Sequence, residues 1–208
     1  MCSLDRRLPR APTALTDETK KRLLMPDLDI GQVWVRWTPD RAERDPELCD
    51  AVASFHPVDS EKARQAGEAA ATWLRERALL DYRSTVTRLL ILDGVLEGFY
   101  SLTSSQVELR TSHRKDMGQH PIQPAALVTW LAKRDGAKIT GMQLLAHAVG
   151  TALRVSDHMG VVALVLDPYD EAAADVWRAP PYNFKNSRTL GPDGTPRLWR
   201  TLLSEAGS

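Results

Sequence analysis

Apolar and polar residues recur at regular spacings along most of the chain, and these spacings predict its secondary structure. Alternation of the two kinds predicts a half-buried strand over Gln32–Trp37. Apolar positions three and four apart, set among Ala, Glu and Arg, predict a helix over Ser60–Tyr82. Two more strands are predicted over Val86–Asp93 and Leu96–Leu109, with a hairpin turn at Asp93-Gly94.

The second half of the chain alternates short apolar runs with helical patterns. Ala125–Lys133 and Gly160–Asp167 are apolar almost throughout, as strands buried on both faces are. A helix is predicted from Gly141 to His158, and another over Asp170–Arg178, which has acidic residues in its first turn. A hairpin around Pro192-Asp193-Gly194 is expected near the end. This order indicates a single α+β (mixed α/β) domain with a mixed sheet.

Three segments have weaker patterns. Residues 1–30 are rich in Pro, Arg and Lys and contain one short helical candidate, Asp17–Met25, so we interpret them as a tail or docking arm preceding a domain over 31–208. Residues 38–55 are expected to form a short helix between proline-containing turns. Residues 110–124 are polar, include Gly and Pro, and predict a long loop.

Composition narrows the function classes. The 208 residues include 27 basic and 27 acidic side chains, and this balance argues against wholesale, sequence-independent binding of nucleic acid. No apolar run is long enough to span a bilayer, and the first residues lack a secretory signal, so a reducing cytoplasm is expected. The two cysteines and five histidines lack metal-ligand spacing, so no metal is predicted.

The stretch Leu131–Leu145, "LAKRDGAKITGMQLL", is the first candidate site. An apolar segment runs into two glycines and a lysine before a helical pattern begins. Such a loop presents backbone N–H groups and the positive end of a helix dipole, which suit a phosphate. A plain turn between a strand and a helix has the same pattern, so both interpretations are open.

Several segments together resemble the GNAT-fold (Gcn5-related) N-acetyltransferases, and within them the GNAT-type toxins of toxin–antitoxin pairs. The resemblance covers about Val33–Leu203 and consists of segment order and short patterns: "WLRERALLDY" followed by "GFYSL", then "LAKRDGAKITGMQLL", then "GVVALVLDPYDEAAADVW". It implies one domain whose central, mostly antiparallel sheet splays between two parallel strands and is flanked by helices.

The resemblance also implies a site for acetyl-CoA. Backbone groups of Leu131, Ala132 and Lys133 would face the thioester and pantetheine. The loop that holds the pyrophosphate would contain Ala137, Lys138, Ile139, Thr140, Gly141 and Met142. The loop departs from the family pattern (Arg/Gln)-x-x-Gly-x-(Gly/Ala), because Gly136 stands at the leading position and Ile139 at the central glycine. A β-branched side chain at 139 is expected to limit how closely a phosphate approaches the backbone.

The residue at the position of the family's proton donor is a second departure from the family pattern. Relatives use a tyrosine in the helix after the splayed strand to protonate the leaving thiolate, and here Trp177 stands at that position. Tryptophan donates only an indole N–H. Tyr182 is therefore the candidate catalytic donor, with Tyr169 as a second. Asp167 and Asp170 are candidates to accept the amine proton, although each is also explained as a helix cap or turn residue.

Two function classes follow. The first is an acyl-CoA-dependent N-acetyltransferase acting on an amine; by resemblance aminoacyl-tRNA is one acceptor, which the neutral charge does not favour. A basic cluster in the long loop, with Arg110, His113, Arg114 and Lys115, is a candidate surface for an anionic substrate, and His113 and His120 are candidate bases. The second class is a non-catalytic GNAT-fold protein that binds a ligand or a partner. An antitoxin-like partner and a homodimer are expected only from the resemblance.

Overall fold

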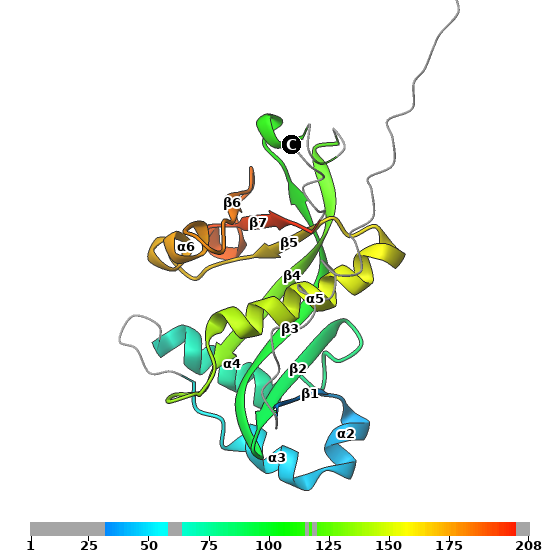
Figure 1. Cartoon of the computed structure of the whole chain (residues 1–208), viewed down its shortest axis with the longest axis vertical. Helices are drawn as coiled ribbons and strands as arrows, with labels where there is room; N and C mark the ends of the chain where they lie inside the picture. Colours follow the sequence, from blue (N-terminus) through cyan, green and yellow to red (C-terminus); the bar gives the residue numbers. More distant parts are fainter. Residues whose placement is uncertain (1–31, 58–63, 115–116, 118–119, 203–208) are drawn as a thin grey trace, which may run out of the picture.

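The fold is built on one seven-stranded sheet with the order β1-β2-β3-β4-β5-β7-β6 (Figure 1). The computed structural model describes residues 32–57, 64–114, 117 and 120–202, so the helix expected over Asp17–Met25 lies outside the described part. All neighbouring strands pair antiparallel except β4 and β5, which are parallel. The predicted mixed, mostly antiparallel sheet is therefore confirmed. The strands are β1 (Gln32–Arg36), β2 (Thr85–Leu92), β3 (Val95–Glu108), β4 (Ile122–Lys133), β5 (Ala163–Leu166), β6 (Lys185–Asn186) and β7 (Leu198–Thr201).

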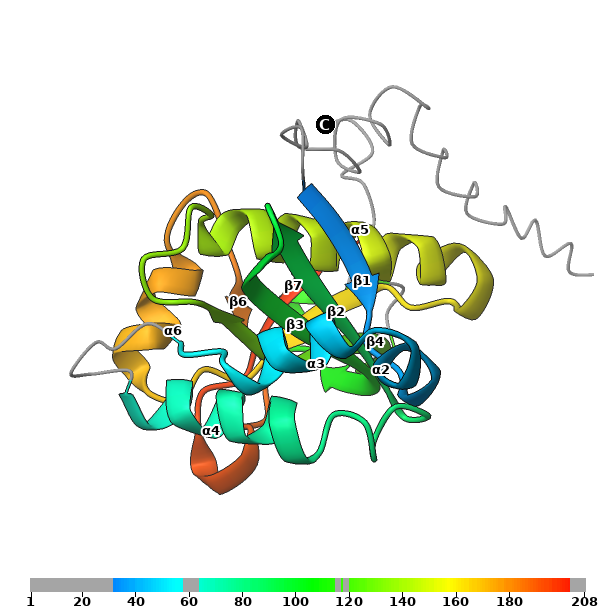
Figure 2. The same cartoon turned by 90° about the horizontal axis from the view of Figure 1, so that it is seen from below.

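Helices cover both faces of this sheet. Figure 2 shows α5 on one face and α3 and α4 on the other. Apolar residues of α5 and of the following strand share one core with Tyr100. Those of α3 and α4 share a second core with Phe99, the residue before Tyr100 in β3. Alternate residues of a strand point to opposite faces, so β3 contributes to both cores. The helices are α2 (Pro39–Arg44), α3 (Pro46–Ala53), α4 (Arg64–Glu76), α5 (Gly141–Met159) and α6 (Glu171–Arg178).

The structure corrects three predicted boundaries. The single helix expected over 38–55 is divided into α2 and α3, because Pro46 disfavours a helical conformation at Asp45, which instead caps α3. The helix predicted over Ser60–Tyr82 ends at Glu76, and the turns after it bury Ala78 completely. Tertiary packing there overrides a favourable helix propensity. Strand β4 begins at Ile122, inside the predicted loop, because Ile122 pairs with Glu108 of β3.

The hairpin between β2 and β3 forms where the sequence predicted it. Asp93 and Gly94 both have positive φ, 52° and 78°. Two-residue hairpin turns of this kind require positive φ at both central positions, which Asp and Gly tolerate. Further along β3 the register against β2 shifts between Leu90 and Ile91, so Glu97 is left without a partner residue in a β-bulge. Bulges redirect side chains, and Glu97 is the one redirected here.

A polar network lies under α5 in the middle of the sheet. His147 stacks on Trp34, with ring centroids 3.7 Å apart and planes 1° from parallel. Its Nδ1 is 2.8 Å from the Tyr100 hydroxyl, which is also 2.8 Å from Thr151 Oγ1. Burial, and then the charges of Arg154 and Arg88, lower the pKa of His147 to about 4. The ring is therefore neutral at pH 7.

This pKa predicts a pH dependence of stability. Below the usual histidine pKa of 6.5 the His147 side chain is protonated in the unfolded chain. In the folded protein it stays neutral until the pH falls to about 4. Its contribution is therefore complete above pH 6.5 and is lost as the pH falls from 6.5 to 4. After allowance for solvent screening it amounts to about 2 kcal/mol. His147→Gln should remove this part of the slope in urea unfolding from pH 7 to pH 4. His158→Gln, exposed on the same helix, should keep it, and equal slopes in both variants would contradict the assignment.

Candidate functional site

A cleft opens where β4 and β5 separate. The two strands pair from Ala125 with Ala163 to Val128 with Leu166, and there the pairing ends. β4 continues to Lys133, whereas the chain after β5 turns away at Asp167-Pro168. The residue after the last pair, Thr129, lies in a bulge of β4 against β3. The splay expected between these strands is therefore present.

Backbone groups of β4 face this cleft. Arg134 N donates to Glu97 O, so Arg134 and Glu97 form a hydrogen-bonded pair of the β3–β4 ladder. In an antiparallel ladder the direction of the N–H and C=O groups alternates from residue to residue. The N–H and C=O groups of Lys133 and Leu131 accordingly point away from β3, toward the side that β5 has left. Among the described residues no strand pairs with that edge between Thr129 and Lys133, and the next contact is an isolated bridge between Arg134 and Pro57.

The cavity at this edge has a volume of about 410 Å³. Its walls are mostly apolar, and Lys133 and Asp167 are the charged residues among those that line it. Such a pocket suits a ligand with a long uncharged part and a few polar groups. The lining comes from α4 (Ala66, Gly67, Ala70), β4 (Val128–Lys133), the end of β5 (Leu166–Tyr169), α6 (Ala173, Val176, Trp177), and from Gly141, Tyr182 and Pro57.

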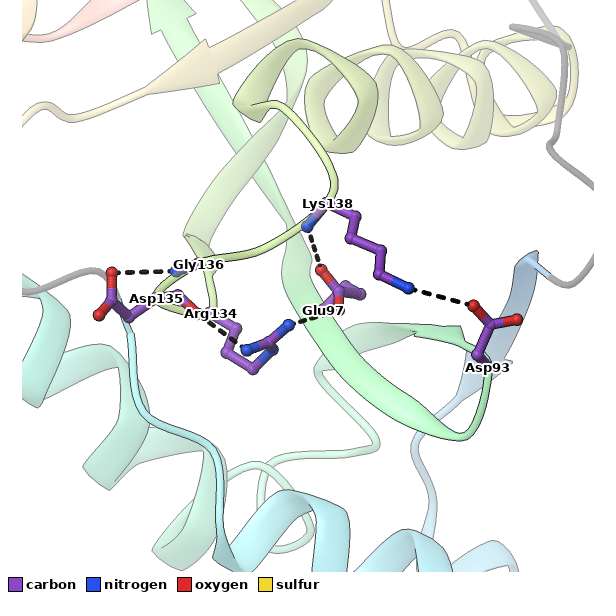
Figure 3. Close-up of polar contacts among 6 residues, drawn as sticks. All are labelled: Asp93, Glu97, Arg134, Asp135, Gly136 and Lys138. Carbon is purple, nitrogen blue, oxygen red and sulfur yellow. Dashed lines mark hydrogen bonds and ion pairs between the residues drawn. The ribbon is translucent and has the colours of Figure 1, made fainter.

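The loop between β4 and α5 is held from beneath by Glu97 (Figure 3). This side chain is 1% exposed and accepts hydrogen bonds from Arg134 Nη2 at 2.7 Å and from Lys138 N at 2.6 Å. At the outer side Lys138 Nζ lies 3.4 Å from Asp93 Oδ2, and both of these side chains are largely exposed. The buried carboxylate thus anchors both ends of the turn, whereas the exposed pair adds little.

The end of the loop forms a complete helix cap. Thr140 Oγ1 accepts from Gln143 N, and Gln143 Oε1 accepts from Thr140 N, which together make a capping box. The first helical N–H groups, those of Gly141 and Met142, have no acceptor among the residues that the structure describes. They point out of the N-terminus of the nineteen-residue helix α5. This end therefore carries free donors and the positive end of the helix dipole.

Ile139 does not lie where the sequence interpretation placed it. Its side chain is 3% exposed and packs with Leu90 and Leu144 in the core, so it points away from the outer side of the loop. The space is available because residue 98 is glycine: a Cβ there would lie 3.2 Å from Ile139 Cδ1 and 2.8 Å from Ala132 O. The expectation that the Ile139 side chain obstructs a phosphate is therefore wrong.

The other predicted cofactor residues, apart from Met142, divide into two groups. Leu131, Ala132, Lys133 and Gly141 line the cleft. The N–H groups of Ala137, Lys138 and Thr140 already donate within the protein, to Arg134 O, Glu97 and Gln143. Only part of the predicted loop is therefore available to a ligand through its backbone.

The aromatic residues after β5 meet in the cleft. Trp177, Tyr182 and Tyr169 all line it, and the rings of Trp177 and Tyr182 make an edge contact at 4.8 Å. Trp177 also packs on Phe184 at 6.2 Å. The predicted donor Tyr182 thus lies beside the position that the resemblance assigned to a tyrosine.

The two carboxylates expected near this site are engaged in structural contacts. Asp167 accepts from Arg197 Nε and Nη2, both at 2.8 Å, in a bidentate pair. Asp170 caps α6 by accepting from Ala173 N at 2.7 Å. The alternative interpretation of Asp170 as a helix cap is confirmed, and neither residue is free to act as a base without losing these bonds.

The basic loop lies away from the cleft. It joins the end of β3 to the start of β4, whereas the nearest cleft residue of β4, Val128, is about 20 Å further along the strand. His113 packs against Trp199, with ring centroids 5.4 Å apart, and His120 Nδ1 lies 2.7 Å from Ile122 O. Lys115 lies outside the described residues. His113 and His120 are therefore not bases for a reaction in the cleft.

Sequence reasoning missed Glu97 and Trp130. Trp130 forms part of the cleft wall and stacks on Trp73, with ring centroids 5.8 Å apart. Glu97 interrupts an otherwise apolar strand beside Gly98, and an acidic residue at such a position is a usable signal of a bulge or a buried partner. No group of three or more potential metal ligands occurs among the described residues. None of the described helices is long and apolar enough to cross a bilayer.

Comparison with known proteins identifies the fold. No family model and no curated protein matches the sequence. AtaT complexed with acetyl-methionyl-tRNAfMet matches with a TM-score of 0.62 and 17% identity, covering 82% of this chain and 94% of that one. A tyrosine-to-phenylalanine mutant of KacT matches with a TM-score of 0.57 and 20% identity, covering 73% and 87%. A mutant AtaT toxin bound to acetyl-CoA and the C-terminus of its antitoxin AtaR matches with a TM-score of 0.56 and 17% identity, covering 82% and 93%. The chain has the GNAT fold, in the form found in these toxins.

The Glu97 anchor gives a prediction for stability. Glu97→Ala leaves the Arg134 guanidinium and the Lys138 N–H without their buried acceptor and should lower the free energy of unfolding by about 2–3 kcal/mol. Asp93→Ala removes the exposed contact to the same lysine and should change it by less than about 0.5 kcal/mol. Urea unfolding measures both values. Similar losses in the two variants would show that burial of Glu97 does not matter.

Proposed function

We propose that the protein is an acyl-CoA-dependent N-acetyltransferase that moves an acetyl group from acetyl-CoA to an amine. The observation that carries the proposal is the splay of β4 from β5, which leaves an unpaired strand edge beside the free N-terminus of α5. Both features face one apolar cavity. A thioester with a long uncharged arm and a pyrophosphate matches this combination of surfaces.

The residues present fit coenzyme A in part. The apolar walls from β4 and α6 suit the pantetheine arm, and the N–H groups of Gly141 and Met142 suit the pyrophosphate. Lys133 lines this end of the cleft and supplies positive charge there, whereas the Lys138 ammonium lies beside Asp93. The N–H of Lys138 is taken by Glu97, so the pyrophosphate loop offers fewer donors than its length suggests. We expect weaker binding of coenzyme A than a loop with all its N–H groups free would give.

The chemistry requires three groups besides the thioester. The backbone N–H groups of Leu131 and Lys133 are positioned to stabilise negative charge on an acyl oxygen. Tyr182 is the candidate to protonate the departing sulfur, since Trp177 has no hydroxyl. Among the described residues that line the cleft, the one carboxylate is that of Asp167, which is paired with Arg197. The amine would then lose its proton to water rather than to a side chain.

The acceptor is proposed only as a primary amine. The printed description of AtaT names acetyl-methionyl-tRNAfMet, and aminoacyl-tRNA is therefore one acceptor to test here. The net charge of zero favours small-molecule or protein amines at least equally. An antitoxin-like protein partner is proposed because one similar structure is an AtaT toxin bound to the C-terminus of its antitoxin AtaR. A homodimer is proposed from the resemblance to the family alone.

A second function is favoured by one observation. Trp177 fills the expected tyrosine position and is packed by Tyr182 and Phe184, so the aromatic group acts as a wall of the cavity. A GNAT-fold protein that binds an acyl-CoA, another ligand or a protein partner without catalysis would also have this arrangement. Acetyl-CoA binding without thiol release in the presence of amines would favour this second function.

Occupation of the cleft is tested with two alanines of one helix. Ala173 lines the cavity, whereas its neighbour Ala172 is exposed and does not. Ala173→Phe should weaken acetyl-CoA binding at least about tenfold by filling the pantetheine space, and Ala172→Phe should leave it unchanged. Isothermal titration calorimetry measures both. If the wild-type protein gives no heat and no thermal stabilisation with millimolar acetyl-CoA, the proposed enzyme function fails.

The role of Tyr182 is tested by removing one hydroxyl. Tyr182→Phe keeps the edge contact with Trp177 and should lower kcat about 10²-fold or more, with little change in KM for acetyl-CoA. Tyr169→Phe, from the same cavity, is the matched control. Thiol release from acetyl-CoA is followed with a panel of polyamines, N-terminal peptides and aminoacyl-tRNA. An equal effect of both substitutions, or none, would exclude Tyr182 as the donor.

A further inference from the structure

Three arginines lie on the face of the sheet that α5 covers, at the end of β1 and β2. Arg36 and Arg88 are cross-strand partners, and Arg88 in turn is opposite Tyr100. Cross-strand partners share a face, and the stacking of Trp34 on His147 shows that for β1 this face is the one toward α5. Arg154 reaches the same place from α5, because its Nη2 donates to Thr151 Oγ1, the partner of the Tyr100 hydroxyl. We call Arg36, Arg88 and Arg154 the arginine cluster.

The charges of this cluster are not balanced by the protein. Among the residues that the structure describes, none of the three forms an ion pair with a carboxylate. Arg88 Nε is buried and has no acceptor. Burial, together with the nearby charges of Arg36 and Arg154, lowers the pKa of Arg88. An unpaired charge held in this way is costly unless an anion compensates it.

The groups beneath the cluster stay neutral and bring no negative charge. Burial raises the pKa of Tyr100 to about 12, so its hydroxyl remains protonated, and His147 is neutral at pH 7. The local charge is therefore about +3 in a chain whose formal net charge is zero. Planar guanidinium groups match the oxygens of phosphate in a bidentate arrangement, and several of them suit a group with more than one negative charge.

A groove continues from the cluster along the outer edge of β1. It has a volume of about 430 Å³ and is lined by residues of β1 and α2, among them Arg36, Arg41, Arg44 and Asp40. Arg41 is paired with Asp45 at 2.9 Å, whereas Arg36 and Arg44 in the same wall form no ion pair with a described residue. Asp40 is the carboxylate that lines the groove. A phosphate bound by the cluster would have room for the rest of its molecule here.

We propose that the arginine cluster is a binding site for a phosphate group, separate from the cleft between β4 and β5. The two sites lie on opposite sides of α5, which packs on β3 and β4. Along the helix itself, Gly141 at the cleft and Arg154 at the cluster are about 20 Å apart. The site does not depend on coenzyme A binding, so the two proposals can fail independently.

The experiment compares two sources of phosphate on the full chain. Inorganic phosphate is titrated by thermal unfolding and ³¹P line broadening, and a single-stranded DNA oligonucleotide of about 12 nucleotides is titrated by fluorescence anisotropy. We expect Arg36→Gln and Arg154→Gln, both at exposed positions, to weaken binding at least about tenfold. Arg83→Gln, an exposed arginine just before β2, is the matched control and should bind like the wild type.

The two probes distinguish the source. Inorganic phosphate that binds as tightly as the oligonucleotide indicates a site for a single phosphate group. An oligonucleotide that binds at least about tenfold more tightly, with affinity falling steeply as salt rises, indicates a nucleic-acid backbone in the groove. Absence of binding by both probes overturns the proposal, as does binding that the Arg36 and Arg154 substitutions leave unchanged.

Arg88 provides an independent readout. Arg88→Met keeps the apolar stem and removes the buried, unpaired charge, so it should raise the midpoint of thermal unfolding without phosphate. The same substitution should abolish the increase that phosphate gives to the wild-type protein. If Arg88 instead stabilised the fold, Arg88→Met would lower the midpoint of thermal unfolding measured without phosphate.

Discussion

The end of pairing between β4 and β5 is the constraint on which the rest of this structure depends. Beyond Val128 and Leu166 the strands cannot rejoin, because β5 runs into Pro168 and Asp167 is fixed by two bonds from Arg197. The bulge at Thr129 changes the direction of β4 at the same level. One interrupted ladder therefore supplies the cavity, its unpaired backbone edge and the place of α6.

The loop that follows β4 depends on contacts from beneath rather than on its own sequence. Glu97 anchors Arg134 and Lys138, and Ile139 is packed over Gly98 in the core. A β-branched residue that looked like an obstacle to a phosphate is thus a reason why the loop has a fixed shape. The same arrangement uses N–H groups that a ligand would otherwise bind, so rigidity here limits the number of donors left for function.

Helix α5 connects two polar regions with different character. Its N-terminus supplies free N–H donors to the cleft, and its second half supplies Thr151 and Arg154 to the arginine cluster. Between them the buried Tyr100 and the half-buried His147 are held neutral, so these two residues add no charge to the polar network beneath the helix. A rigid helix of this kind fixes the relative positions of both regions.

The sequence by itself determined the order of most elements, the Asp93-Gly94 hairpin and the resemblance to the GNAT fold, because periodicity and turn chemistry are local properties. Of the two strands predicted to be fully buried, β5 is buried throughout, whereas the second half of β4 is partly exposed where β5 leaves it. The sequence also indicated that Trp177 and Tyr182 belong to the same part of the site, and in the structure their rings are in contact. The tertiary structure alone decided the direction of Ile139, the bulge that buries Glu97, the pairing of Asp167 with Arg197 and the meeting of Arg36, Arg88 and Arg154. Each of these joins residues distant in sequence, and their positions depend on strand register and on the space left by neighbours such as Gly98.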